Sequence, residues 1–280
     1  PAYPLPPRVG VPLGFSPLHR ILQTLLVIDQ LRKRDALGAK GIGEIWFEPS
    51  TMLPDILVKY IFTSEKLSVQ VHPSDANTEA AGLGRQGKEE CWLITSAEPG
   101  ASLAIGFKEQ LSEAEVRIAA LDGSIEDLLA WYPVTVGDFF YIPAGTVHAI
   151  GAGVSLIEVQ QTSDITYRLY DYGRPRELHL DEAMAVAKLE PYDQTLRNRI
   201  VQNDSRLLVE GPHFRLAYVD GSAPGSLAQK PVPSCLVIPI EGSVKVDGEL
   251  VRSGECALLE GGALQFGERD RFLLASSASY

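Results

Sequence analysis

The segment GDFFYIPAGTVH, residues 137–148, decides the fold that we predict for this chain. Glycines border its apolar run, which predicts a turn, a strand and a second turn. A second segment, GECALLEGGALQ, can be laid on the first at a constant offset of 117 residues, from 137 to 254. Glycine pairs with glycine and acid with acid, and His148 falls on Gln265. We interpret the pair as an internal repeat, although the second copy alone would be a common turn–strand pattern.

The pattern G-D-x-x-x-I-P-x-G-x-x-H resembles the second signature motif of the cupin superfamily, whose members are small β-barrels of jelly-roll type. In that motif the glycines make turns and the histidine points into the barrel. The resemblance implies a mainly β protein with two cupin-like barrels, of which only the first has a metal-type histidine at this position. We predict a catalytic domain at residues 1–190 and a second domain without metal ligands at residues 204–280.

A small helical insert is predicted within the first barrel. The sequence SEAE at residues 112–115 has the form of a capping box, so a helix should run from there to about Leu121. A second short helix should begin at Ser124 and end near Trp131. A further helix is predicted over residues 180–189, shortly before a proline.

The remaining segments are predicted from local patterns. Asp247-Gly248 between alternating apolar runs predicts a β-hairpin in the second domain. Residues 1–17 contain several prolines and are interpreted as an extended arm. The apolar spacing over residues 16–37 fits either a helix or a buried strand.

Composition limits the classes of partner. The chain has 280 residues, and 45% hydrophobic residues are enough for a sizeable core. A formal net charge of −11 argues against nucleic acid as a partner. Three widely spaced cysteines favour a reducing compartment. The early apolar run at residues 25–28 is too short to span a bilayer, and the start has no signal-peptide pattern. We therefore predict a cytoplasmic protein without a membrane partner.

Four side chains form a candidate ligand set for a divalent metal. Gln70 and His72 are two residues apart in a predicted strand, so they point to the same side, and Pro73 ends that strand. Glu90 begins the next apolar run, and His148 ends the repeated segment. One amide oxygen, two imidazoles and one carboxylate suit Zn²⁺, which accepts nitrogen and oxygen ligands. Each residue alone fits a structural role, but their convergence favours a metal site.

Four segments together resemble type I mannose-6-phosphate isomerases. They occur in the family's order over about residues 41–174, in a chain of the size of the short bacterial forms: VQVHP at 69–73, GKEECW at 87–92, IPAGTVHA at 142–149 and SDITYRLYD at 163–171. The resemblance implies a zinc-dependent aldose–ketose isomerase that interconverts mannose 6-phosphate and fructose 6-phosphate.

The resemblance also implies roles for individual residues. One Zn²⁺ per chain would be bound by Gln70, His72, Glu90 and His148. Arg168 would be a catalytic or substrate-positioning arginine. Lys88 would lie close to the reacting carbons.

The chemistry of isomerisation gives these residue types a purpose. A proton must move between C1 and C2 through an enediol, a metal can polarise the two oxygens, and an arginine fork can hold paired oxygens. The proton carrier stays open: Lys88 could serve if nearby positive charges disfavour its charged form, and Glu158 is a second candidate. Glu158 could equally be an exposed strand residue. Lys66 and Ser68 are candidates for binding the phosphate, although Lys66 could be a plain surface charge.

Two alternative functions stay open at this point. The chain could be a metal-dependent cupin enzyme that acts on another sugar phosphate. It could also be a non-catalytic sugar-binding cupin, although a pure binder would not need an open metal position beside Lys88 and Arg168. In each case the partner is a small sugar phosphate, and we expect a monomer or a homodimer.

A shift of register by one residue would exchange Glu89 for Glu90 at the metal.

Overall fold

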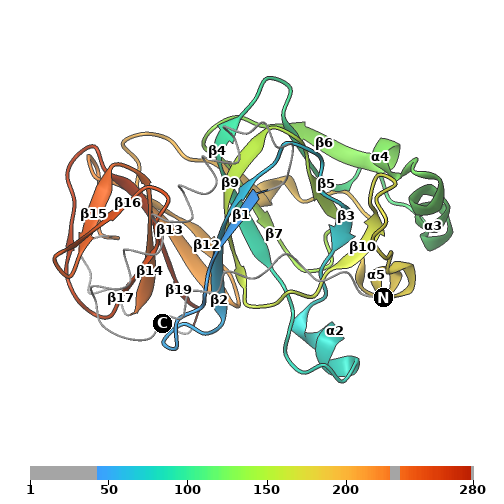
Figure 1. The fold of residues 1–280 in the computed structure, drawn as a ribbon, viewed down its shortest axis with the longest axis horizontal. Coiled ribbons are helices and arrows are strands. Elements are labelled where there is room, and N and C mark those ends of the chain that lie inside the picture. Colours follow the sequence, from blue (N-terminus) through green and yellow to red (C-terminus); the bar gives the residue numbers. More distant parts are fainter. Residues whose placement is uncertain (1–42, 228–233, 279–280) are drawn as a thin grey trace. The chain divides into compact units, whose positions relative to one another are not determined.

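The computed structural model describes residues 43–227 and 234–278, drawn in colour in Figure 1. Our predictions for residues 1–17 and 16–37 lie outside this part of the chain. The described residues form two compact units. We call residues 61–201 the histidine unit, and residues 44–60 together with the described residues from 202 onward the C-terminal unit. None of the helices in the described ranges has the length and apolar character that crossing a membrane requires.

Two antiparallel sheets build the histidine unit. The first contains, in spatial order, β9 (Val154–Gln161), β4 (Glu90–Ala97), β7 (Asp138–Ile142) and β11 (Arg197–Arg199). The second contains β10 (Tyr167–Tyr170), β3 (Val69–Val71), β8 (His148–Ile150), β5 (Ser102–Phe107) and β6 (Leu129–Pro133). Trp92 and Phe140 of the first sheet share one buried core cluster with Leu103 and Ile105 of the second. The two sheets therefore face each other as in a jelly roll.

Helices cover the other face of the second sheet (Figure 1). They are α3 (Glu113–Asp122), α4 (Ile125–Leu128) and α5 (Leu180–Val186). Val69 and Val71 pack with buried residues of these helices, such as Val116 and Ala183. Because side chains alternate along a strand, Gln70 points to the opposite face, toward the space between the sheets. The helices thus determine which side of β3 can carry polar groups for a site.

The predicted insert is confirmed, with an error at its end. Ser112 and Glu115 form the expected reciprocal capping box at the start of α3. The next helix, α4, ends at Leu128 rather than near Trp131. Trp131 lies in β6 and pairs with Ala104 of β5. Ladder hydrogen bonds to a neighbouring strand outweigh the marginal stability of a one-turn helix.

The sequence does not predict α2 (Asp75–Ala80), which begins shortly after β3 and His72. Its capping box pairs Ser74 with Asn77, an amide in place of the usual Glu or Gln. The chain then returns to Gly87, where an added Cβ would lie 2.3 Å from the backbone nitrogen of Asp75. This close approach needs glycine, and it brings the start of β4 next to the end of β3.

The C-terminal unit also contains two sheets. Its elements include most of β1 (Gly43–Phe47) and most of β2 (Ile56–Phe62). One sheet has the order β12 (Arg206–Glu210), β13 (Phe214–Asp220), β19 (Arg271–Ser277), β14 (Cys235–Glu241) and β17 (Ala257–Leu259). The other has β16 (Glu249–Arg252), β15 (Ser243–Val246) and β18 (Leu264–Gln265).

A 3₁₀ turn at Gln194–Leu196 belongs to the histidine unit. The proposed domains at 1–190 and 204–280 stay a prediction, and residues 44–60 group with the C-terminal unit.

The hairpin and the internal repeat are both visible in the backbone. Asp247 and Gly248 have φ of 51° and 87°, as a two-residue hairpin turn requires. Gly137 and Gly254, which the repeat pairs, have φ of 90° and 88°. The carboxylate after each glycine accepts a hydrogen bond from the backbone N–H three residues before it: Thr135 to Asp138 at 2.8 Å and Arg252 to Glu255 at 2.7 Å. These matching turns support the repeat, and Gln265 in the second copy is exposed.

A buried ion pair offers a stability test of the C-terminal unit. Asp220 at the end of β13 accepts a hydrogen bond from Arg271 Nε at 3.0 Å, and further ones from the backbone N–H groups of Ser222 and Asn203. Burial alone would raise the pKa of Asp220, but these hydrogen bonds outweigh it and lower the pKa to about 2. We expect Asp220→Ala to lower the free energy of unfolding by about 2–3 kcal/mol, measured by denaturant titration.

The lowered pKa of Asp220 also predicts how the free energy of unfolding changes with pH. Because the folded pKa of Asp220 lies below its ordinary value of 3.8, its contribution is fully present above pH 3.8 and is lost as the pH falls toward 2. The wild type should therefore lose stability over this window more steeply than the variant. The control is Asp204→Ala, since Asp204 is half exposed and pairs with Arg206 at the surface. Equal losses in the two variants would contradict the assignment.

Candidate metal centre

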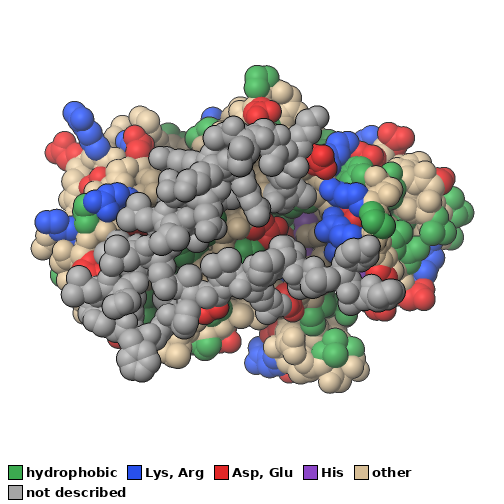
Figure 2. Space-filling model, in the orientation of Figure 1, with side chains coloured by type: hydrophobic (Ala, Val, Ile, Leu, Met, Phe, Trp, Pro, Cys, Tyr) green, Lys and Arg blue, Asp and Glu red, His purple; other side chains and the backbone are tan. Residues whose placement is uncertain are grey.

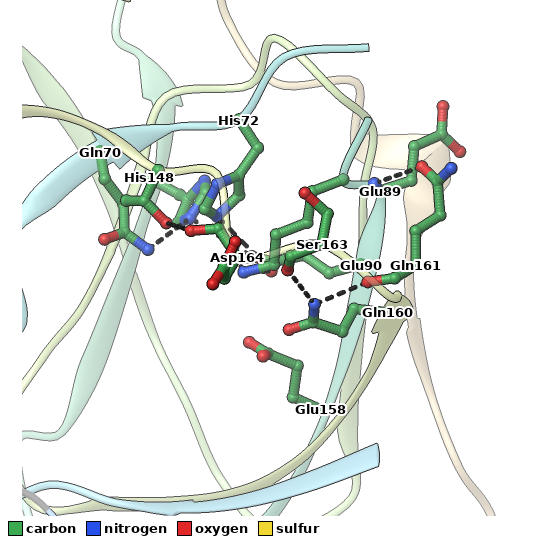
Figure 3. Close-up of polar contacts among 12 residues, drawn as sticks. Gln70, His72, Glu89, Glu90, His148, Glu158, Gln160, Gln161, Ser163 and Asp164 are labelled. Atoms are coloured by element: carbon green, nitrogen blue, oxygen red, sulfur yellow. Dashed lines mark hydrogen bonds and ion pairs between the residues drawn. The ribbon is translucent and has the colours of Figure 1, made fainter. Parts of the chain in front are cut away.

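Three ligand-type side chains from both sheets of the histidine unit meet in its interior (Figure 3). His72 directly follows β3, His148 is the first residue of β8, and Glu90 is the first residue of β4. Their exposed fractions are 2%, 1% and 0%. The strand starts and ends place all three at one end of the sandwich, where polar side chains can converge.

The distances within this group suit a shared ion. His148 Nε2 lies 3.3 Å from Glu90 Oε1, and His72 Nε2 lies 3.6 Å from Glu90 Oε2. The candidate ligand atoms all lie within 4.8 Å of one another. Two imidazole nitrogens and a carboxylate oxygen are the donor types of catalytic zinc sites, which use three protein ligands and keep a position open.

Backbone carbonyls orient both imidazoles. His72 Nδ1 lies 2.8 Å from the Ile165 carbonyl, and His148 Nδ1 lies 2.9 Å from the Thr146 carbonyl. Each Nδ1–H therefore donates to the backbone, so that the Nε2 lone pair faces Glu90. Burial lowers the pKa of both histidines, and the Lys88 ammonium lowers that of His72 further. Neutral imidazoles with aligned lone pairs are the form that binds a metal, so the residues fit a divalent cation.

Gln70 lies beside these three residues. It is directly opposite His148 in the β3–β8 ladder, and its Nε2 is 3.3 Å from His148 Nε2. Its Oε1 accepts a hydrogen bond from Ser68 Oγ at 3.1 Å. The predicted role as an oxygen ligand requires the amide to turn over by about 180°, an exchange of O and N that hardly changes its shape.

Lys88 reaches into the same group. Its Nζ lies 2.7 Å from Glu90 Oε2 and 3.1 Å from His72 Nε2, and its exposed fraction is 5%. The neighbouring Glu89 points the other way, where Tyr141 donates a hydrogen bond to its carboxylate. The register between β4 and its neighbours thus directs Glu90, and not Glu89, to the two histidines.

The predicted catalytic residues Arg168 and Glu158 come from different sheets, and Glu158 is the buried one of the two. Arg168 is directly opposite Gln70 in the β10–β3 ladder, and its Nη1 donates to the Glu177 carbonyl at 2.9 Å. Burial, followed by the Arg176 guanidinium, lowers the pKa of Arg168. Glu158 has an exposed fraction of 3% and accepts from Trp92 Nε1 at 3.1 Å, so it is not the exposed strand residue that we considered.

The two predicted phosphate-binding residues differ in their surroundings. Ser68 is buried and its hydroxyl is engaged with Gln70. Lys66 is half exposed, forms an ion pair with Glu126 and lies 5.0 Å from the centre of the Trp131 ring. Sequence reasoning missed a further polar residue of this interior, Gln160, although its spacing of two from Glu158 on a strand is a usable signal.

The sandwich and its buried polar group define a cupin-type protein with a candidate metal centre. Among solved structures the chain is similar to mannose 6-phosphate isomerase from Bacillus subtilis, with a TM-score of 0.65, 24% identity, and coverage of 90% of this chain and 81% of that one. A phosphomannose isomerase variant from Salmonella typhimurium gives a TM-score of 0.61 at 15% identity over 80% of this chain and 78% of that one. These likenesses confirm the mainly β, cupin-like fold that the sequence predicts.

Sequence comparison identifies the family within this class. The chain is 36% identical over 224 residues to mannose-6-phosphate isomerase ManA of Bacillus subtilis (strain 168), a match that covers 75% of this chain and 70% of ManA. It is also 36% identical over 207 residues to mannose-6-phosphate isomerase of Streptococcus mutans, covering 70% of this chain and 64% of that protein. No protein-family model matches the chain. The chain belongs to the family of mannose-6-phosphate isomerases, which are aldose–ketose isomerases.

The ligand assignment can be tested by metal content. His148→Ala removes one of three converging ligand atoms, so we expect zinc affinity to fall by more than roughly 100-fold, the loss found for weaker outer contacts. Zinc bound per chain, measured after dialysis against a defined free zinc concentration, reports this directly. His213→Ala in the C-terminal unit is the matched control and should keep the wild-type content. Unchanged metal binding in His148→Ala would rule out this centre.

Proposed function

We propose that the chain is a zinc-dependent isomerase that interconverts mannose 6-phosphate and fructose 6-phosphate through an enediol. The observation that carries the proposal is the contact of Lys88 Nζ with both His72 and Glu90, which puts a proton-carrying group next to the candidate metal ligands. Membership of the mannose-6-phosphate isomerase family supports the choice of substrate.

The candidate ligands would hold the metal ion that serves as the electrophile of the reaction. Zn²⁺ held by His72, Glu90 and His148, with Gln70 as a fourth ligand, would polarise the oxygens on C1 and C2. Ser68 would hold the Gln70 side chain in place, because its hydroxyl contacts that amide and can accept from the amide nitrogen once the amide has turned over. The carbonyls of Ile165 and Thr146 would keep the two imidazoles in the binding tautomer.

A protein base must carry the hydrogen between the two carbons. It removes the C2 hydrogen of the aldose as a proton, the electron pair forms the C1–C2 double bond, and the C1 oxygen gains a proton to give the enediol. Return of a proton to C1, with loss of the proton on the C2 oxygen, gives the ketose. Lys88 and Glu158 are the candidate carriers, because both are buried and face the same interior.

Cationic side chains would hold the anionic parts of the substrate. Arg168 shares a face of the second sheet with Gln70 and His148 and can bind paired oxygens. Lys66 stays our candidate for the phosphate, since its Nζ and the Arg174 guanidinium each lie 5.5 Å from the Tyr172 ring centre. Figure 2 shows Lys and Arg side chains gathered on the exposed part of the histidine unit.

The proposal is tested by assaying turnover before and after chelation. Purified protein is given mannose 6-phosphate, and fructose 6-phosphate is detected by coupled enzymes. We expect activity to vanish with a chelator and to return on addition of zinc, because the candidate ligands hold a removable ion. Protein that contains its metal and shows no turnover would refute the activity with this substrate. Activity that resists complete metal removal would refute the zinc requirement.

Lys88 is tested by a substitution that retains its length. Lys88→Met should lower kcat by about 10²- to 10⁴-fold, the usual contribution of a proton-transfer group. Metal content should stay at the wild-type level, because the three ligand residues are intact. Lys108→Met is the control, since Lys108 is exposed and donates to the Asp127 carbonyl. Wild-type kcat in Lys88→Met would leave Glu158 as the carrier.

A further inference from the structure

Gln160 has an amide whose donor side is fixed. The residue lies on β9 and has an exposed fraction of 0%. Its Nε2 donates to the Gln161 carbonyl at 2.7 Å and to the Ser163 carbonyl at 2.9 Å. Turning the amide over would place Oε1 against two carbonyl oxygens, and neither of them can donate a hydrogen bond. The two backbone contacts therefore determine where the amide oxygen points.

That oxygen is a buried acceptor in need of a donor. Among the described residues, no donor lies within hydrogen-bonding distance of Gln160 Oε1. Buried amide oxygens normally accept at least one hydrogen bond, so an unmatched one marks a place where a ligand group completes the set. Since a reversed amide is excluded by the carbonyls of Gln161 and Ser163, the site offers an acceptor only.

Strand register directs this acceptor into the candidate active site. Gln160 is directly opposite Glu90 in the β9–β4 ladder, and opposite residues share a face of the sheet. Glu158 is two residues earlier on β9 and shares that face. Figure 3 shows the amide nitrogen of Gln160 turned to the Ser163 and Gln161 backbone, and its oxygen on the side of Glu158. The acceptor thus belongs to the interior that contains His72 and His148.

We infer that Gln160 Oε1 accepts a hydrogen bond from the C3 or C4 hydroxyl of the sugar phosphate and makes this residue specificity-determining. The inference rests on the proposed function. An acceptor repels the phosphate and the C1 and C2 oxygens, which gain negative charge during the reaction. The C3 and C4 hydroxyls stay protonated throughout and are hydroxyls in both the ring and the open-chain forms. They are the groups that a fixed neutral acceptor recognises.

Two variants separate the acceptor from the donor side. Gln160→Met removes both, whereas Gln160→Glu keeps the acceptor oxygen and, as a protonated buried acid, retains one donor in place of two toward the carbonyls. Each is assayed with mannose 6-phosphate and with its 3-deoxy and 4-deoxy analogues. Melting temperature and bound zinc are measured for each variant, and Gln194→Met, at an exposed position, controls for loss of an amide elsewhere.

The expected result is a coupling between one hydroxyl and one side chain. In the wild type, one deoxy analogue should lose about 10- to 100-fold in kcat/KM, because it leaves the buried oxygen unpaired. In Gln160→Met that penalty should shrink to less than about 3-fold, while Gln160→Glu and Gln194→Met retain it. Equal penalties in the wild type and Gln160→Met would overturn the inference, as would a wild type indifferent to both deoxy changes.

The design separates this inference from the proposed function. Turnover of mannose 6-phosphate by the wild type establishes the function before Gln160 is examined. If the wild type does not turn it over, the function fails, and calorimetric binding of the parent and deoxy sugar phosphates tests Gln160 alone. Equal affinities, or no binding, would then overturn the role of Gln160. If Gln160→Met does not fold, the deoxy penalties of the wild type and Gln160→Glu decide: both must show the same hydroxyl preference.

Discussion

The buried carboxylate of Glu90 is the constraint on which the site depends. A fully buried carboxylate is unstable without positive charge or hydrogen-bond donors beside it. Here Lys88 supplies an ammonium at 2.7 Å, and two neutral imidazoles present lone pairs that a divalent cation would share with the same carboxylate. The aromatic core around Trp92 holds β4 in place, so the charge cannot move toward solvent. The sandwich therefore holds a carboxylate that is unfavourable to bury beside Lys88 and the two histidines of the candidate metal centre.

Much of this arrangement could be predicted because its signals are local. Alternation along residues 68–72 placed Gln70 and His72 on one face, and glycines with positive φ fixed the turns of the repeated segment. The choice of Glu90 over Glu89 needed the register of β4, which sequence leaves open by one residue. The structure resolves it through long-range pairing with β7 and β9, an interaction that no local pattern contains.

The missed features depend on contacts between distant segments. Trp131 is in a strand and not in the expected helix because it pairs with β5. The Ile165 carbonyl orients His72, which is far from it in sequence, and the Thr146 carbonyl orients the nearby His148. Lys66 likewise finds Glu126 in the helical insert, a partner 60 residues away. Backbone groups carry no side-chain signature, so a sequence indicates ligands more readily than it indicates what orients them.

The interior divides its polar groups by charge, a division that would suit the sugar phosphate of the proposed function. Lys88 presents a donor and positive charge, which would suit the oxygens that become negative in the proposed isomerisation, and Arg168 shares a sheet face with Gln70. Strand β9 presents acceptors instead, the Glu158 carboxylate and the fixed amide oxygen of Gln160. Hydroxyl groups that stay neutral can donate a hydrogen bond on that side. On the proposed function, a substrate with an anionic end, two reacting oxygens and inert hydroxyls would therefore be oriented before any bond changes, since the reverse orientation would bring like charges together.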